Sequence, residues 1–323
     1  MDIDAVITWV DGQDPAFIAQ KAKYVENKDI LDREDVAGWQ RYENNGEIFF
    51  CVASLNIFAP WIRKIWIVTA GQDPKLDPFL DKYFPEGHIP YEIVDHSVIF
   101  KGYEEFLPTF SSTAIETMTW RIPGLSEAYI DLNDDFMLAA PAVPEDFFPG
   151  DGSVVCYGTR QNIWFTRMTR KLKKAGVVTY KGKMINSADM VGKKCWYIRI
   201  QHTPRALLKS FFENYYKLHP EAIIRNIRTR FRSADNFNVH ELFYLSMMKV
   251  ERCKLLSPRG RLLYLKPDAR RRRLYLDRKL WELAGRNYKF ACMNSLDPDS
   301  AKYVYGRLPE VFLRSGKMHN AQE

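Results

Sequence analysis

The sequence lacks the features that mark several common classes of protein. No apolar run approaches the roughly 20 residues that a membrane-spanning helix needs, and no charged, apolar leader precedes the first apolar segment. The five cysteines are scattered and never spaced as CxxC, which argues against a disulfide framework or a structural zinc site and for a reducing compartment. We therefore expect a cytoplasmic protein.

Motifs of several enzyme classes are absent as well. GxGxxG, GxxxxGK[ST], GxSxG and HExxH do not occur in their usual contexts, so dinucleotide-binding, P-loop, serine-hydrolase and zincin assignments lose their main support. Positive charge, in contrast, is in excess: the net charge of +7 and the pI near 9.0 favour an anionic partner. Charge alone does not choose among a nucleotide, a phosphorylated glycan, a lipid headgroup and a nucleic acid.

The first half of the chain alternates between strand and helix patterns. Short apolar runs closed by turn residues predict strands, and apolar residues three or four positions apart predict helices. This alternation is typical of an α/β fold, a mostly parallel sheet with helices on both faces. The predicted strands are 3–10, 62–69, 91–95 and a fourth that begins at Tyr129 and closes on Asn133–Asp135, and the predicted helices lie between Gly46 and Pro60 and over 111–120.

The second half has a different pattern. β-branched and aromatic runs predict a small antiparallel insertion with strands at 154–157, 177–180 and 196–200 and a basic helical segment near 167–174. Thr203-Pro204 has the chemistry of a helix start, and that helix is expected to run through Leu218, with others over 233–250 and 268–288. We expect one catalytic domain, 1–323, made of an α/β donor-binding half (1–150), a β-rich insertion (151–200) and a helical part that completes the active site (201–323).

An acidic stretch follows the fourth predicted strand. Asn133, Asp134 and Asp135 would lie at its carboxyl end, where open α/β sheets bind their ligands. Two adjacent carboxylates and an amide are hard oxygen ligands suited to Mg²⁺ or Mn²⁺ shared with a pyrophosphate. The alternative is a plain turn, since Asn-Asp-Asp is also common loop chemistry. Asp11 and Asp14 follow the first strand in the same way.

Cationic and titratable residues of the second half are further candidates. His202 precedes the predicted helix start at Thr203, and this setting favours a neutral imidazole that accepts a proton near pH 7. The alternative is a histidine hydrogen-bonded at a helix start with no catalytic duty. Arg230 and Arg232 lie at a helix junction, where a planar guanidinium could clamp a phosphate, and the alternative is a solvated face.

Four separated blocks of the chain, in this order, resemble a known family. They are Ile3–Pro15; a long block that includes Asn45-Gly-Glu47, 59–69, 95–97, 107–116 and 129–138; His202-Thr-Pro-Arg205 with 230–235; and Phe290–Asn294. They resemble the Stealth family of sugar-1-phosphate transferases, which includes bacterial capsular polysaccharide phosphotransferases and the catalytic part of N-acetylglucosamine-1-phosphotransferase.

The resemblance implies a Rossmann-like, glycosyltransferase-related α/β core, a nucleotide-sugar donor that is commonly UDP-linked, such as UDP-GlcNAc, and a divalent metal, Mg²⁺ or Mn²⁺. Two positions depart from the family pattern. Ser111 stands where the family usually has Asn, and Asn294-Ser295 stands where it has Asn-Asp, with Asp297 as a candidate substitute. The role of the fourth block is therefore left open.

The resulting hypothesis is transfer of a hexose-1-phosphate, for example N-acetylhexosamine-1-phosphate, from a UDP-sugar to a glycan hydroxyl. The reaction would form a phosphodiester in capsule or cell-surface polysaccharide synthesis and release UMP. In it Asp134 and Asp135 bind the metal, with Asn133 nearby.

The remaining candidates take other roles in this hypothesis. Arg232, with Arg230 as its partner, stabilises the phosphoryl oxygens, and His202 is the general base. Asp11 and Asp14 contact the donor or the acceptor, or support such a contact from behind.

Two rival functions are kept at this stage. One is a metal-dependent glycosyltransferase, which would release UDP. The other is a non-catalytic basic module that binds nucleic acid or an anionic membrane through Arg270–Arg273. Most aromatic residues lie in apolar segments typical of a core, so we expect no nucleic-acid partner. The resemblance places the enzyme in the cytoplasm and leaves open peripheral contact with the inner face of the cell membrane; the sequence predicts no oligomeric state.

Overall fold

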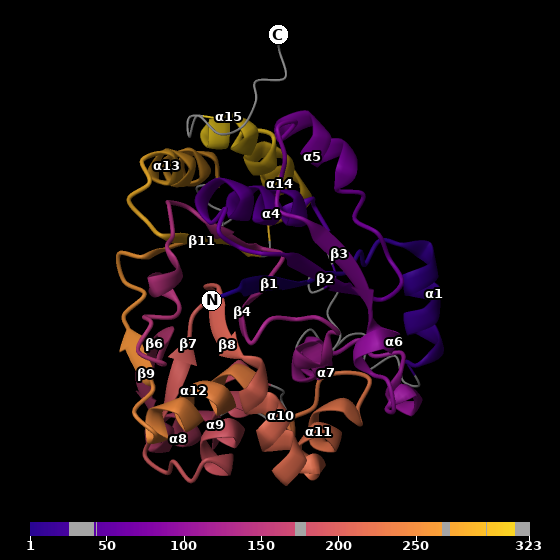
Figure 1. Cartoon of the computed structure of the whole chain (residues 1–323), viewed down its shortest axis with the longest axis vertical. Coiled ribbons are helices and arrows are strands. Elements are labelled where there is room, and N and C mark those ends of the chain that lie inside the picture. The colour runs from indigo at the N-terminus through magenta and orange to yellow at the C-terminus, as the bar shows by residue number, and fades with distance from the viewer. Residues whose placement is uncertain (26–41, 43, 172–178, 267–271, 295, 314–323) are drawn as a thin grey trace.

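A five-stranded sheet in the order β3-β2-β1-β4-β8 forms the centre of the fold (Figure 1). The computed structural model describes residues 1–25, 42, 44–171, 179–266, 272–294 and 296–313. The strands are β1 (Ile3–Thr8), β2 (Ile65–Thr69), β3 (Tyr91–Asp95), β4 (Ala128–Asn133) and β8 (Arg205–Leu208). The first four run parallel and β8 runs antiparallel to β4, which confirms the predicted mostly parallel α/β sheet.

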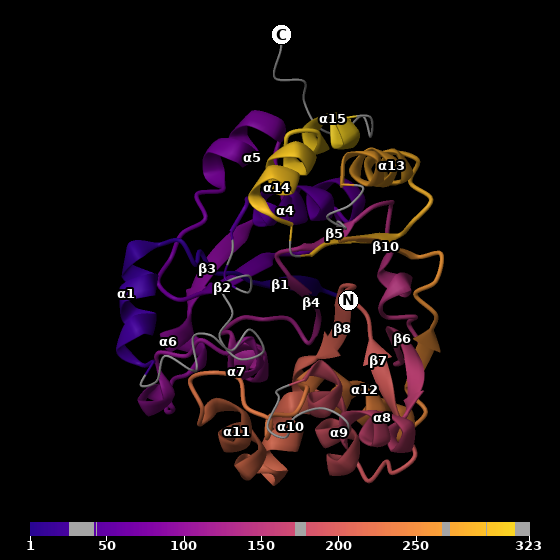
Figure 2. The same ribbon diagram turned by 180° about the vertical axis from the view of Figure 1, so that it is seen from behind.

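Helices cover both faces of this sheet, as Figures 1 and 2 show. Strands β1 and β2 are almost wholly buried, which explains why they read as continuous apolar runs rather than as alternating ones. One face carries α4 (Glu47–Phe58) and α5 (Asp77–Tyr83). The other carries α6 (His96–Ile99), α7 (Ser112–Met118), α10 (Lys209–Leu218) and α11 (Pro220–Ile227). Helix α1 (Pro15–Lys23) follows β1, and short 3-10 turns span Glu104–Phe106, Thr119–Arg121 and Pro144–Asp146.

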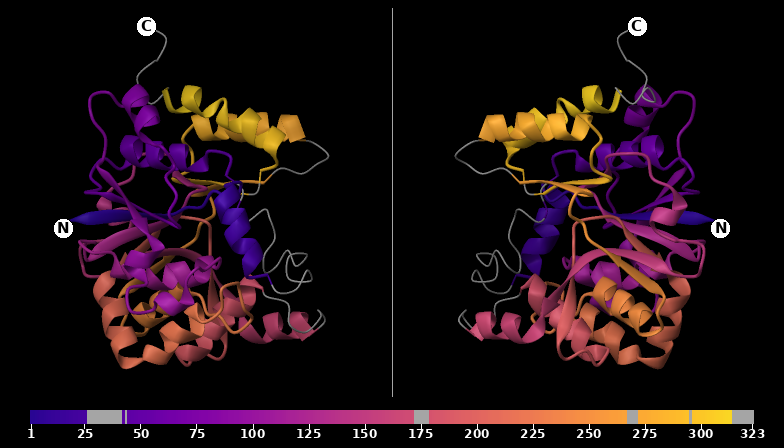
Figure 3. Two further views of the ribbon diagram at one scale, coloured as in Figure 1. Left: turned by 90° about the vertical axis from the view of Figure 1, so that its right-hand side faces the viewer. Right: turned by 90° about the vertical axis from the view of Figure 1, so that its left-hand side faces the viewer.

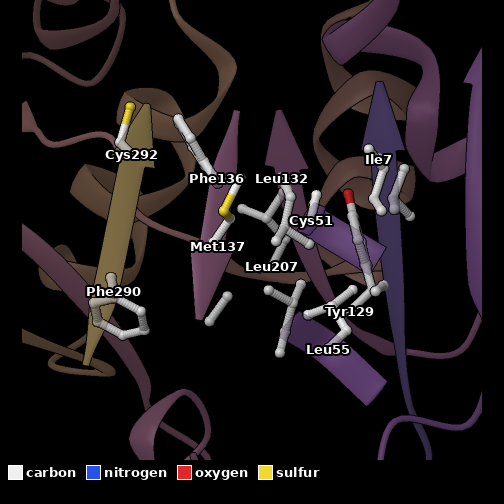
Figure 4. Close-up of a cluster of buried hydrophobic side chains, with 14 of the residues drawn as sticks. Ile7, Cys51, Leu55, Tyr129, Leu132, Phe136, Met137, Leu207, Phe290 and Cys292 are labelled. Atoms are coloured by element: carbon white, nitrogen blue, oxygen red, sulfur yellow. The ribbon is translucent and has the colours of Figure 1, made fainter. Parts of the chain in front are cut away.

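Helix α4 covers the same face of the main sheet as α5 and is the more buried of the two. It begins after Gly46, whose φ of +86° is a left-handed conformation that glycine adopts without strain, and it ends ahead of Pro60. Both ends agree with the prediction. Nearly all of its side chains are buried, and Cys51 and Leu55 face the centre of the cluster drawn in Figure 4.

A second, three-stranded sheet extends this core beyond the main sheet. It has the order β10-β11-β5 and consists of β10 (Leu262–Leu265), β11 (Phe290–Met293) and β5 (Phe136–Leu138). Strand β5 pairs antiparallel with β11, so that Phe136 lies opposite Cys292. The predicted fourth strand is β4, which ends at Asn133 as expected, and β5 follows it after a turn at Asp134–Asp135.

The third sheet, in the order β7-β6-β9, corresponds to the predicted insertion. Strands β6 (Val154–Asn162) and β7 (Trp196–Ile200) are antiparallel as predicted, but β9 (Cys253–Leu256) joins β6 in parallel. The strand predicted at 177–180 is wrong at Tyr180, which begins α9 (Tyr180–Met190) after the N-cap Thr179; residues 177 and 178 lie outside the described part. Helices α8 (Ile163–Lys171) and α12 (Val239–Lys249) pack here.

The helix predicted from Thr203 through Leu218 is confirmed at its end, but its predicted start is wrong. Residues Arg205–Leu208 form β8 and pair with β4, which buries Ala206 and Leu207, and the helix begins only at Lys209. Strand pairing overrides the local capping chemistry here, and region 201–323 is not purely helical. Its remaining helices are α13 (Arg272–Ala284), α14 (Pro298–Tyr305) and α15 (Leu308–Leu313). In the described part of the chain, every helix is too short or too polar to cross a bilayer.

Candidate active site

The candidate site lies at the carboxyl edge of the main sheet. Thr8 of β1 pairs with Asn133 of β4, and Thr69 of β2 pairs with Asp95 of β3, so the strands end level with one another. The loops that follow them therefore meet at a single edge, which is where a ligand binds in folds of this kind. The chain runs from the N-terminus into β1, so this edge lies on the side opposite the N-terminus in Figure 3.

Strand β11 holds the acidic turn in place. The backbone N–H of Met293 donates to the carbonyl oxygen of Asp135 at 3.1 Å. The Asp135 carboxylate atom Oδ2 accepts hydrogen bonds from Asn294 Nδ2 at 3.0 Å and from the Cys292 thiol at 3.4 Å. The fourth sequence block, whose role was open, thus fixes one of the two predicted metal ligands.

A third carboxyl group faces the same turn. Glu47, the first residue of α4, is buried, and its carboxylate accepts from the backbone N–H of Asn45 at 2.6 Å. Burial and the neighbouring carboxylates of Asp135 and Glu47 raise the pKa of Asp134 well above its ordinary value. Burial, and more weakly Asp135, also raises the pKa of Glu47. Acids arranged in this way repel one another unless a cation lies among them.

His202 lies beside this turn, in the loop between β7 and β8. Its ring packs against Phe136, with ring centroids 5.8 Å apart, and against Tyr264, at 5.4 Å. Burial lowers the pKa of His202; Asp135 opposes this effect and nearby Arg205 adds to it. The predicted neutral imidazole is supported, but the cause is burial and neighbouring cations rather than a helix terminus.

A buried ionic network supports the turn from below. Arg205 Nη1 donates to Asp131 Oδ2 at 2.8 Å and to Asn133 Oδ1 at 3.2 Å, and its guanidinium lies 4.9 Å from the centre of the Phe136 ring. His240 Nε2 lies 2.8 Å from the same Asp131 oxygen. Burial opposes ionisation, but His240 and Arg205 hold the pKa of Asp131 below its ordinary value. The predicted amide ligand Asn133 is thereby oriented by Arg205.

The loop after β1 places the first pair of candidate acids. Gln72 joins them: its side chain accepts from the Asp11 N–H at 3.0 Å and donates to Asp14 Oδ2 at 3.0 Å. Asp14 also caps α1 through the Ala16 N–H at 2.8 Å, and the Gln72 and Ala16 contacts lower its pKa. Asp14 lines an open hollow of about 460 Å³ together with α1 residues and 70–71. Both acids thus have local structural duties.

The two predicted arginines lie on the other side of this loop. Phe17, Tyr42 and Phe110 form a small apolar cluster that packs on Phe231. Phe231 lies between Arg230 and Arg232 in the sequence. Arg232 Nη2 donates to Ser112 Oγ at 2.7 Å. Arg230 Nη2 donates to the carbonyl oxygens of 105 and 107, and its Nε has no hydrogen-bond partner among the described residues.

The predicted residues therefore fall into two groups. Asn133, Asp134, Asp135 and His202 are brought together by β5, β8 and β11. The second group lies next to the small apolar cluster and consists of Asp11, Asp14, Arg230 and Arg232. Among the described residues, the side-chain hydrogen bonds of this group lead to Gln72, Ser112 and backbone groups rather than to the acidic turn. Arg270 and Arg271 lie outside the described part, and Arg273 stacks on Tyr303 at 4.5 Å.

Several buried polar atoms along this edge have no hydrogen-bond partner within the described chain. They come from successive strand ends and from the N-cap of α7: Trp9 Nε1, Thr69 Oγ1, His96 Nε2, Asp135 Oδ1 and Ser111 Oγ. An unsatisfied buried polar group costs about 1–3 kcal/mol, so such a row indicates a polar ligand at this edge. Burial lowers the pKa of His96 to about 4, so this ring is neutral near pH 7.

The donor set fits a divalent cation. Asp134 and Asp135 offer carboxylates, and Asp135 Oδ1 is buried without a hydrogen-bond partner among the described residues, whereas the amide oxygen of Asn133 already accepts from Arg205. Sequence reasoning assigned no role to Glu47, Arg205 or Cys292. All three belong to the quoted sequence blocks, but only the tertiary contacts show which side chains they face.

Comparisons with known proteins identify a family model and relatives that match the chain. Residues 1–29 match conserved region 1 of Stealth proteins, and residues 41–155 match conserved region 2. A capsular polysaccharide phosphotransferase of Actinobacillus pleuropneumoniae is 30% identical over 283 residues, which is 82% of this chain and 72% of that protein. An exopolysaccharide phosphotransferase of Streptomyces coelicolor is 32% identical over 237 residues, 73% of this chain.

The match spans only 37% of the length of that Streptomyces protein. Among solved structures, the galactosyltransferase LgtC in complex with donor and acceptor sugar analogues aligns over 99% of this chain and 97% of its own, with 11% identity and a TM-score of 0.48.

Proposed function

The chain belongs to the Stealth protein family, and from that premise we propose that it transfers a hexose-1-phosphate from a nucleotide sugar to a polysaccharide hydroxyl. The donor we propose is a UDP-sugar, for example UDP-GlcNAc, and the products are a phosphodiester-linked glycan and UMP. The observation that carries the proposal is the acidic turn Asp134–Asp135, which lies within electrostatic reach of Glu47 and whose Asp135 lies close to His202. This arrangement suits a cation and a diphosphate.

The proposed cofactor is Mg²⁺ or Mn²⁺. Asp134 and Asp135 would hold it, with Asn133 oriented toward the same turn by Arg205. When bound, the ion neutralises negative charge on the diphosphate. Asp11 and Asp14 would contact the donor from the β1 side, where Asp14 faces the hollow beside α1.

The proposed chemistry breaks the P–O bond between the sugar-bearing phosphorus of the donor and the oxygen that bridges the two phosphates. The acceptor hydroxyl oxygen attacks the phosphorus that carries the sugar, its proton passes to the imidazole of His202, and the oxygen of UMP leaves with the bonding electron pair. Arg232 would stabilise the phosphoryl oxygens, with Arg230 Nε, which has no hydrogen-bond partner among the residues that the structure describes, as a second donor. Positioning and charge complementarity supply most of the catalysis in such transfers.

The nucleotide product tests this proposal directly. The chain is incubated with UDP-sugars, Mg²⁺ and candidate glycans, and the nucleotides are separated by chromatography. We expect UMP in amounts equal to the phosphodiester formed. Release of UDP would identify the rival glycosyltransferase reaction, and absence of both nucleotides with every glycan would reject a transferase acting on these donors.

We also propose that the enzyme works in the cytoplasm, in peripheral contact with the membrane. Trp164 and Phe165 of α8 are 70% and 58% exposed, on a helix anchored by buried Ile163. Arg160 and Lys193 lie nearby, over the ring of Trp196. Apolar rings flanked by cations suit an anionic lipid surface. Figure 3 shows α8, in pink, on the side that the carboxyl edge faces.

Vesicle sedimentation checks this placement. We expect the chain to sediment with vesicles that contain anionic lipid, and less so at high salt. Trp164→Ala should reduce the bound fraction, whereas Trp281→Ala, which removes an equally exposed ring from α13, should not. Equal binding of both variants would reject α8 as the contact.

A further inference from the structure

The acidic turn has a second face with different ligand chemistry. One ligand atom each from Asp135, His202 and Cys292 lies within 4.8 Å of the other two. These residues come from three separate segments, namely the β4–β5 turn, the β7–β8 loop and β11. The Cys292 side chain is fully buried, and its sulfur already lies 3.4 Å from Asp135 Oδ2. Within the described part of the chain, Asp135 Oδ1 is buried without a hydrogen-bond partner.

This second face does not suit the ion that the first face suits. Mg²⁺ takes oxygen ligands in octahedral geometry, whereas sulfur, imidazole nitrogen and carboxylate oxygen together favour Zn²⁺ or Co²⁺. Three protein ligands with an open fourth position are the pattern of reactive zinc sites. A tetrahedral site with bonds of about 2.0–2.3 Å needs ligand atoms roughly 3.3–3.8 Å apart, so a closure of about 1 Å would complete it.

We infer that Asp135, His202 and Cys292 form a binding site for a borderline-soft divalent cation such as Zn²⁺, and that this ion inhibits the enzyme. On binding, a metal–sulfur bond forms and the Cys292 thiol proton passes to the solvent. The imidazole nitrogen of His202 becomes a ligand and no longer accepts the acceptor's proton. Asp135 is shared, so the inhibitory ion and the activating ion compete. Only the inhibition rests on the proposed function; the binding site does not.

Cobalt spectroscopy tests the site without any activity measurement. Because Cys195 is the exposed cysteine, the titration uses the otherwise full chain carrying Cys195→Ser. We expect Co²⁺ to give a near-ultraviolet thiolate-to-cobalt charge-transfer band together with intense visible bands of four-coordinate Co²⁺. Adding Cys292→Ser should abolish the charge-transfer band. Adding Cys51→Ser should leave it, since Cys51 is buried near the same acids but outside this group.

A second measurement keeps all three ligand residues in place, so its result does not depend on whether the Cys292→Ser variant folds. X-ray absorption of the zinc-loaded Cys195→Ser chain should show one sulfur at about 2.3 Å and lighter ligands at about 2.0–2.2 Å. No sulfur neighbour, or a cobalt band that survives Cys292→Ser, would overturn the inference. Zinc should also inhibit turnover in Mg²⁺, reversibly on chelation, with a half-inhibiting concentration raised at least about tenfold by Cys292→Ser.

The two proposals fail in different ways. A cobalt–sulfur band in a chain that makes neither UMP nor phosphodiester would retain the soft-metal site and reject the proposed function. Turnover that releases UMP, in a chain that shows neither a cobalt–sulfur band nor zinc inhibition, would retain the proposed function and reject the soft-metal site.

Discussion

Asp134→Asn is expected to abolish turnover and at the same time to stabilise the metal-free protein. Activity should fall by about 10³-fold or more, because the variant loses a carboxylate at the point where charge on the diphosphate must be neutralised. The metal-free fold should gain stability, because Asp134 is held near Asp135 and Glu47 with its pKa raised well above the ordinary value. The opposite signs of the two effects distinguish a functional acid from a structural one.

The pH dependence of stability follows from the direction of that shift. A carboxyl group whose pKa is raised on folding binds protons more tightly in the folded state than in the unfolded state. The metal-free wild type should therefore lose stability as the pH rises from the ordinary aspartate range toward the raised folded value. Asp134→Asn removes this loss, so the stability difference between variant and wild type should grow over that interval and then level off.

Urea unfolding with and without Mg²⁺ provides the measurement. Mg²⁺ at 100 times its dissociation constant should stabilise the wild type by about 2.7 kcal/mol and the variant by much less. Asp73→Asn is a matched control, because Asp73 is an exposed acid whose pKa is lowered by Lys75. It should leave turnover and the Mg²⁺ effect unchanged. Normal turnover by Asp134→Asn would refute the assignment of Asp134 as a metal ligand.

Local sequence patterns were sufficient to predict the secondary structure at the start of the chain. The apolar runs of β1 and β2 and the helix between Gly46 and Pro60 carry their own start and stop residues, and the structure confirms them. Because parallel strands end at one edge, strand assignment alone placed Asp11 and Asp134 at that edge. The family resemblance pointed to the same residues independently.

The second half could not be predicted in the same way because its structure depends on long-range pairing. Thr203-Pro204 has good helix-start chemistry, yet Arg205–Leu208 pair with β4 and form a strand. The site residues missed by sequence reasoning show the same limit. Glu47 and Cys292 both interact with Asp135 across a long stretch of sequence. Glu47 precedes Asp135 by 88 positions (135 minus 47), and Cys292 follows it by 157 positions (292 minus 135). Local patterns carry no information about such contacts.

His202→Asn is expected to lower kcat by about 10²–10⁴-fold while leaving the apparent affinity for the donor nearly unchanged, because the lost group acts on the acceptor hydroxyl. The wild-type rate should fall on the acid side with an apparent pKa below the ordinary histidine value, since burial, Arg205 and Arg199 lower the pKa of His202. The negative charge of Asp135 raises the pKa of His202, so a cation bound at Asp135 would offset this effect and lower the pKa of His202 further. The enzyme should therefore be fully active at pH 7.

Arg199→Gln tests the cause of the shift. Arg199 is exposed, so its loss should not disturb the fold, and removing a positive charge near the ring makes the protonated imidazole more favourable. The acid limb should move to higher pH, and only slightly, as expected of a partly screened charge. In His202→Asn the residual rate should lose this limb altogether. A limb that keeps its position in His202→Asn would assign the titration to another group and would leave the proposed base without support.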